Sequence, residues 1–188
     1  MGKRRKNLKN IKAKVENNLA NTKDIPDVLI GQTHGFNFYS VYDWLNSTDE
    51  FISSDGFTNN LSSPEQFAKN IYLVIHEMIP KLYKDCDSIF NFGSHMYPHC
   101  HTVKGDSIEL VKKIAEKVNG SELLDVIEDE DYSWWQVGFT GSIRMFGIYN
   151  KNENSFFPLF VDWHHLIYES IKYNGEDYSN YNYSPGGS

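Results

Sequence analysis

The chain has 188 residues, of which 40% are hydrophobic and 15% aromatic, and its formal net charge is −7 at pH 7. This length and apolar content are enough for one domain with a sizeable core. The 2 cysteines exclude a disulfide framework, and no run approaches the roughly 18 consecutive apolar residues that a membrane span requires. We therefore expect a cytoplasmic protein with reduced thiols and no membrane partner.

The first segment of the chain is strongly basic. The run MGKRRKNLKNIKAK holds 7 Lys and Arg residues and no acid, which leaves 11 basic against 25 acidic side chains in the remainder. Such an arm either grips a phosphate backbone or an acidic partner, or is only a solvated terminus. No apolar segment follows it, so we do not expect a signal peptide. We predict a basic arm at 1–24, a single α+β domain at 25–172 and a flexible polar tail at 173–188.

The next two predicted elements are short. The run DVLIG at 27–31 predicts a strand, since turn-forming residues bound it on both sides. Phe38, Tyr42 and Leu45 recur at helical spacing, which predicts a shared helix face. A polar loop follows, and it leads to the first element with a defined start.

That element is a helix beginning at Ser63. Ser63 is a favourable N-cap residue, Pro64 suits the first helical position, and Gln66 completes a capping box. Apolar residues then recur on one face as far as the early eighties. Pro80 lacks the N–H that the helical ladder needs, so we expect it to kink or end the helix.

The last third of the chain changes its period. A helix at 106–118, ended by an Asn-Gly pair, precedes three predicted strands at 132–139, 142–150 and 156–162. Pro158 cannot donate to a strand ladder, which predicts an edge, a bulge or a strand start at that position. This order predicts an α+β fold, with helices packed on one face of a mainly antiparallel sheet that ends in a three-strand meander.

The run FNFGSHMYPHCHTV at 90–103 is a first candidate site. His99 and His101 point the same way on a strand, and they could share a zinc ion with His95, Cys100 or a later histidine. No CxxC pair or HExxH helix accompanies them, so we assign no metal and no cofactor. Clustered histidines also suit proton transfer near neutral pH, which makes His99 and His101 catalytic candidates.

A second candidate site is the run DWHHLIYES, which places four polar side chains at the end of the last strand. Asp162, His164, His165 and Tyr168 are the candidates. If the strand continues, the carboxylate and the first imidazole share a face, and a carboxylate often orients an imidazole in this way. The structural alternative is that Asp162 caps a short helix starting at Trp163.

An arginine among apolar neighbours completes the candidates. Arg144 lies within the run SIRMFG. It either holds a phosphate bidentately or is buried and pairs with Asp162 or a carbonyl group. Both interpretations stay open at the level of sequence.

The run YSWWQVGFTGSIRMFGIYNKNENSFFPLFVDWHHLIY resembles the hairpin core of the RelE/ParE superfamily of small bacterial toxins, with the two predicted helices before it. The resemblance covers about half of the chain. It implies cleavage of RNA, either on the ribosome or free. In that family basic residues position the phosphates, so Arg144 would be the phosphate contact. His164, His165 and Tyr168 would be the acid–base candidates.

We therefore expect a toxin-like, metal-independent endoribonuclease of a bacterial or phage mobile element, with RNA or the ribosome as partner and an antitoxin as inhibitor. The first alternative is a protein without enzymatic activity that binds a host protein. The second is a histidine-ligated metalloenzyme. The catalytic hypothesis requires that folding bring the 95–101 imidazoles and the 162–168 segment together beside Arg144.

Overall fold

The structure is a computed structural model, and it describes residues 35–48, 56–127, 131–139, 141–168 and 177–186. These residues belong to one compact unit, Thr33–Ser188. The predictions for the basic arm and for the strand at 27–31 lie outside the described residues. Within those residues, no helix combines the length and the apolar character needed to cross a membrane.

The centre of this unit is a five-stranded sheet with the strand order β1-β5-β4-β3-β2. Only β1 and β5 pair in parallel, and the other three pairs are antiparallel. The three predicted C-terminal strands are confirmed as the meander β3–β4–β5. The strands are β1 (Asn37–Phe38), β2 (His101–Thr102), β3 (Tyr132–Val137), β4 (Arg144–Asn150) and β5 (Ser155–Asp162).

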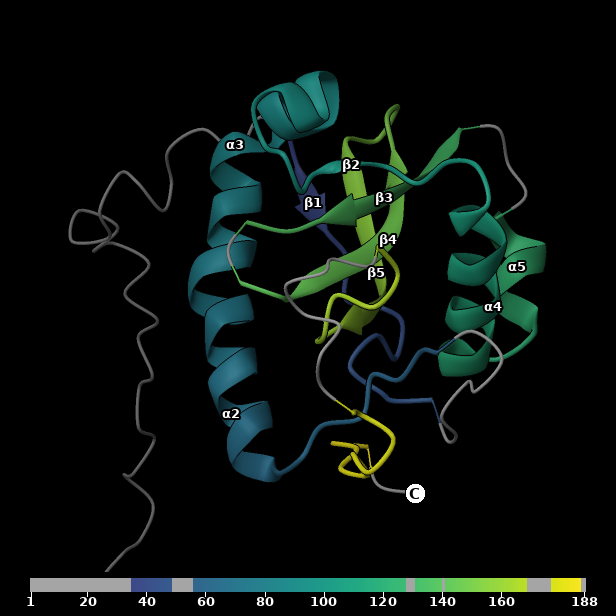
Figure 1. The fold of residues 1–188 in the computed structure, drawn as a ribbon. Coiled ribbons are helices and arrows are strands. Elements are labelled where there is room, and N and C mark those ends of the chain that lie inside the picture. The colour runs from purple at the N-terminus through teal and green to yellow at the C-terminus, as the bar shows by residue number, and fades with distance from the viewer. Residues whose placement is uncertain (1–34, 49–55, 128–130, 140, 169–176, 187–188) are drawn as a thin grey trace, which may run out of the picture. The chain divides into compact units, whose positions relative to one another are not determined.

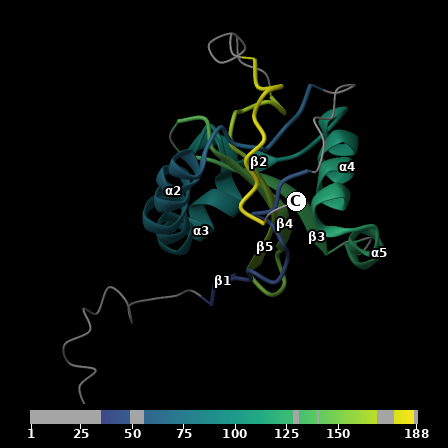
Figure 2. The ribbon, with the colours of Figure 1, turned by 90° about the horizontal axis from the view of Figure 1, so that it is seen from below.

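Helices cover both faces of the sheet, and the expectation that they share one face is therefore wrong (Figures 1 and 2). The α+β class itself is confirmed. Helices α2 and α3 lie on one side, and α4 and α5 lie on the other. The helices are α2 (Pro64–Leu73), α3 (Ile79–Phe92), α4 (Ser107–Asn119) and α5 (Glu122–Ile127).

The meander strands explain the two helical layers, because they are apolar on both sides. Successive strand residues point to opposite faces. Trp135 and Val137 therefore join the core under α2 and α3. Trp134 packs against the second core under α4, and Phe146 of β4 is part of that core. Each face exposes apolar surface that only a helix can bury, so a single helical layer would not suffice.

The long first helix passes through Pro80 without ending. Ser63 caps it as predicted, since its hydroxyl accepts from the backbone N–H of Gln66 at 3.3 Å. Between α2 and α3 lies a π-helical turn, Val74–Met78, in which the N–H of Ile79 donates to the carbonyl of Val74. The wider turn lets the helix continue, because its hydrogen-bond pattern accommodates the N–H that Pro80 lacks.

Two further expectations meet different outcomes. The bulge predicted beside Pro158 is present, since the register between β4 and β5 shifts at Phe146 and Gly147. The helix face predicted from Phe38 to Leu45 is wrong. Phe38 instead belongs to β1, whose parallel pairing with β5 outweighs the local helical spacing. In the described part of the predicted tail, Tyr183 exchanges two 2.9 Å backbone hydrogen bonds with Leu61.

Candidate functional site

The two histidine-bearing segments meet at one end of the sheet. The rings of His99 and His165 lie 6.4 Å apart between centroids, with an angle of 87° between their planes. Beside them, the rings of His101 and Tyr168 lie 5.1 Å apart. The sheet produces this meeting, because the loop after β5 returns toward the strand end where β2 pairs with β3. The catalytic roles predicted for these residues stay predictions.

The imidazoles of His99 and His165 are both shifted toward their neutral form. Partial burial is the main cause that lowers the pKa of His99, and the charges of Arg144 and His165 lower it further. Burial, followed by the charge of Arg144, likewise lowers the pKa of His165. A neutral imidazole near neutral pH accepts a proton, which is the property a general base needs.

Arg144 is a buried positive charge that acts on both imidazoles, since, together with their partial burial, it lowers the pKa of His99 and of His165. Its side chain is 2% exposed. Its Nη1 donates to the carbonyls of Gly141 and Ile143 at 2.9 and 2.8 Å. Gly138 gives it room, since a Cβ there would lie 2.6 Å from the Arg144 Cδ. Of the two interpretations of Arg144, this geometry favours pairing with carbonyl groups over an exposed guanidinium fork.

Asp162 shapes the turn that carries His165. Its carboxylate accepts from the backbone N–H groups of His164, Leu166 and Ile167 at 3.0, 2.7 and 3.0 Å. Burial raises its pKa to about 6, and these hydrogen bonds oppose the rise. The short helix predicted to start at Trp163 does not form, because the amides of this turn bond to the carboxylate.

Consecutive histidines in this turn have different environments. His164 is 4% exposed, its Nε2 lies 2.7 Å from the carbonyl of Asn60, and its ring stacks on Tyr178 at 4.3 Å. His165 adopts φ 63°, a left-handed conformation that is uncommon for residues other than glycine. This reversal of the chain turns the second imidazole toward His99. It also prevents a helix, whose residues all have negative φ.

Gln136 is a site residue that the sequence analysis missed. It is 2% exposed, and its Nε2 lies 3.2 Å from both the His99 carbonyl and the His101 Nε2. His101 Nδ1 lies 3.2 Å from the Thr102 carbonyl. A proton on His101 Nδ1 satisfies both contacts of this ring, since Nδ1 then donates to the Thr102 carbonyl and Nε2 accepts from the Gln136 amide. The available signal was a lone amide in the apolar strand YSWWQV.

Cys100 lies between two of the candidate histidines but is not activated. Its Sγ donates to the carbonyl of Gly138 at 3.3 Å, and burial raises its pKa to about 11. The thiol is therefore protonated near neutral pH and is a weak nucleophile. Within the described ranges, no group of three or more His, Cys, Asp and Glu side chains is placed to hold a metal ion.

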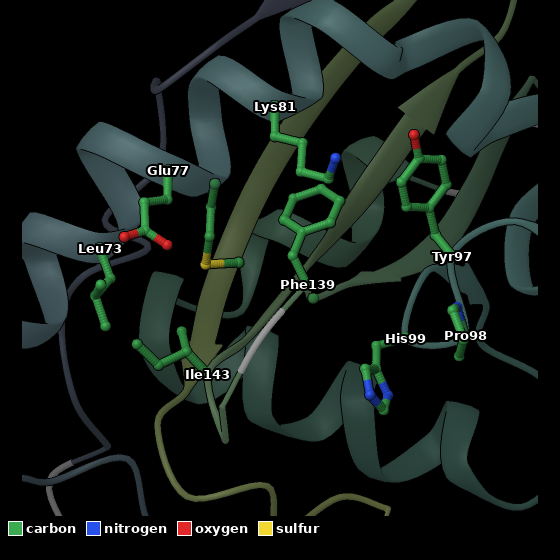
Figure 3. Close-up of a pocket in the computed structure, with 10 residues that line it drawn as sticks. Leu73, Glu77, Lys81, Tyr97, Pro98, His99, Phe139 and Ile143 are labelled. Atoms are coloured by element: carbon green, nitrogen blue, oxygen red, sulfur yellow. The ribbon is translucent and has the colours of Figure 1, made fainter.

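A pocket of about 190 Å³ lies beside His99 of the imidazole pair (Figure 3). It lies between the π-helical turn and the β3–β4 loop, and His99 is part of its wall. Apolar side chains make up most of the remaining wall, and Glu77 and Lys81 reach it from the helix. The full lining is Leu73, Glu77, Met78, Lys81, Tyr97, Pro98, His99, Gly138, Phe139 and Ile143.

The comparisons with known proteins decide the family. A family model described as "Uncharacterised protein UU032" matches residues 40–188. The "Uncharacterized protein UU032" of Ureaplasma parvum serovar 3 (strain ATCC 700970) is 30% identical over 190 residues, which cover 98% of this chain and 94% of that protein. The chain belongs to the UU032 family. No solved structure matches it.

Membership of the UU032 family corrects the resemblance to the RelE/ParE toxins, which no comparison supports. The pattern behind that resemblance has a general cause. Antiparallel strands covered on both faces need nearly continuous apolar runs, and Trp135, Phe146 and Phe160 are buried here for that reason. The apolar pattern is typical of such a meander, so it does not identify a toxin.

Proposed function

We propose that this protein cleaves RNA by metal-independent acid–base catalysis at His99 and His165. The observation that carries the proposal is the ring pair itself, 6.4 Å apart and nearly perpendicular. At this separation, two imidazoles can contact one small tetrahedral group from two sides. Both are partly exposed to solvent, both have a lowered pKa, and a buried guanidinium lies beside them.

The proposed reaction requires two proton transfers and no metal. One imidazole takes the proton of the ribose 2′-hydroxyl, and the 2′-oxygen then attacks the adjacent phosphorus. The bond from phosphorus to the 5′-oxygen breaks as the second imidazole, in those molecules in which it carries a proton, donates that proton to the 5′-oxygen. The products are a 2′,3′-cyclic phosphate and a 5′-hydroxyl end.

The surrounding groups support each part of this reaction. The charge of Arg144, which lowers the pKa of both imidazoles, also attracts the phosphate, although the guanidinium is itself buried. The hydrogen bond with Gln136 fixes the ring of His101 beside the pair. The proposed substrate is single-stranded RNA, free or on the ribosome. The proposed location is the cytoplasm, which suits two free cysteines.

The proposal is tested with the purified full-length protein and a short fluorescent RNA in buffer containing EDTA. Wild type should cleave the RNA and leave a 2′,3′-cyclic phosphate end, detected by mass spectrometry. His99→Ala should lower kcat/KM by about 10²-fold or more, the range expected for loss of a general acid or base. His95→Ala is the matched control, since His95 is exposed in the same segment, and it should retain activity.

Two results would contradict this proposal. Loss of cleavage in EDTA that zinc or manganese restores would favour the metalloenzyme. An absence of cleavage by the folded wild type, with or without metal, would favour a role in binding alone.

One observation favours a second candidate function, which is binding of a host protein. Phe92 and Met96 are 59% and 57% exposed at the end of α3, and large exposed apolar side chains often mark an interaction surface. In this case the double variant Phe92→Ser, Met96→Ser should lose a partner that wild type retains in cross-linking from cells. The His99→Ala variant should keep that partner.

A further inference from the structure

The pocket beside His99 combines features that suit one planar, polar-edged ligand. Its apolar wall includes Met78 and Ile143, and Phe139 adds an aromatic ring (Figure 3). Its volume of about 190 Å³ is below the ~300–1,000 Å³ of sites for drug-sized ligands. The pocket therefore suits a single heterocyclic ring system.

The aromatic side of the pocket is held in place before any ligand binds. The rings of Tyr97 and Phe139 lie 6.0 Å apart, at 84° to each other. The Lys81 ammonium lies 5.0 and 5.5 Å from the two ring centroids. It is itself fixed by a 2.9 Å ion pair with Asp85. A preorganised wall of this kind loses little entropy when a flat ligand stacks on it.

The helical side of the pocket supplies a carboxylate. Glu77 lies in the π-helical turn Val74–Met78 and lines the pocket. Turns of this kind inside α-helices occur frequently at functional sites. In Figure 3 the Glu77 carboxylate extends from the helix toward the pocket, which Met78 also lines. A carboxylate accepts hydrogen bonds only, so it selects a ligand that carries N–H donors.

We propose that this pocket binds the base of the nucleotide next to the cleaved phosphate, and that it prefers bases with an exocyclic amino group. The inference rests on the proposed function, because His99 belongs to both the pocket wall and the imidazole pair. The base stacks against Phe139 and donates its amino group to Glu77. Single-stranded RNA is commonly read in this way, by stacking and by hydrogen bonds to the base edge. Guanine, adenine and cytosine have this amino group, and uracil lacks it.

The test is calorimetric titration of the full-length protein with the 3′-monophosphates of guanosine, adenosine, cytidine and uridine, in EDTA. At least one amino-bearing nucleotide should bind about tenfold more tightly than the uridine nucleotide, as expected for one good base contact. Glu77→Gln should reduce this difference to about twofold. Glu153→Gln is the matched control, since Glu153 is exposed in the β4–β5 turn, and it should leave the difference unchanged.

Equal affinities for the four nucleotides, or an unchanged preference in Glu77→Gln, would overturn the inference. These outcomes are distinguishable from failure of the proposed function, because binding is measured without cleavage. Base-dependent binding by a protein that never cleaves RNA would support the pocket and contradict the ribonuclease. Cleavage of RNA by a protein that binds all four nucleotides equally would support the ribonuclease and contradict the proposed role of the pocket.

Discussion

The two histidine-rich segments look alike in sequence but differ in what the fold does with them. In the first, 95–101, His99 is exposed and lines a pocket. In the second, 162–168, Asp162 and His164 are 1% and 4% exposed and bond to the backbone. Of the two histidines in this segment, only His165 turns back toward the first segment. The comparison shows that histidines close together in sequence can have different roles. Some stabilise the fold, and others remain candidates for catalysis.

The largest expected effect distinguishes the neighbouring residues His164 and His165. His165→Ala should lower kcat/KM for RNA cleavage by about 10²- to 10⁴-fold, with a change below about 1 kcal/mol in the free energy of unfolding. His164→Ala should instead cost about 2 kcal/mol, because it removes a buried ring and leaves the half-buried Asn60 carbonyl without the imidazole. Cleavage kinetics and urea denaturation of both variants measure these effects. If His164→Ala and His165→Ala lost the same activity per folded molecule, the distinction between a structural His164 and a catalytic His165 would be wrong.

The carboxylate that organises the second segment should have the next largest effect. Asp162→Ala removes the acceptor for three backbone N–H groups, and we expect it to cost about 3 kcal/mol in the free energy of unfolding. Urea denaturation at pH 7 measures this cost. A change below about 1 kcal/mol would show that the turn holds without its carboxylate.

The pH dependence of stability should reveal the burial of the same group. Its pKa rises from 3.8 to about 6 in the folded state, so the folded protein binds this proton more tightly than the unfolded chain. Wild type should therefore gain about 1 kcal/mol relative to Asp162→Asn as the pH falls from 7 to 5. The lowered pKa values of His99 and His165 act in the opposite direction. They are common to both proteins and cancel in the difference.

The smallest expected effect concerns the backbone at His165. Its φ of 63° suits glycine, whereas a side chain in this conformation costs roughly 1–2 kcal/mol. His165→Gly should therefore be more stable than His165→Ala by about 1 kcal/mol. Lys84 is an exposed position inside α3. There the glycine variant should be less stable than the alanine variant, since glycine weakens a helix by about 1 kcal/mol. Thermal denaturation of the four variants compares the two positions.

Much of the fold was predictable because its signals are local. The three strands of the meander begin within two residues of their predicted starts, since apolar runs and turn residues are read within a short window. The cap at Ser63 follows from its own side chain. A kink or an end was expected at Pro80, and the helix does not end there because of the widened turn before it, Val74–Met78, which no single residue indicates.

The candidate site was predictable only in part. Histidines at strand ends suggested that the two segments could meet, and the structure brings His99 and His165 together. The sequence did not separate His165 from His164, since that depends on one positive φ. Gln136 was missed because an amide in a strand usually faces solvent. Here its strand is covered on both sides.

The sequence by itself determined that this protein has an antiparallel meander, a well-capped first helix and histidines concentrated near strand ends, because periodicity, caps and turns act over a few residues. Only the tertiary structure decided which imidazoles face each other, where the pocket opens and that helices cover both faces of the sheet. Those features depend on pairing between distant segments, such as His101 with Gln136 and Arg144 with Asp162. They also depend on the burial that follows, which shifts the pKa values of His99, Asp162 and His165.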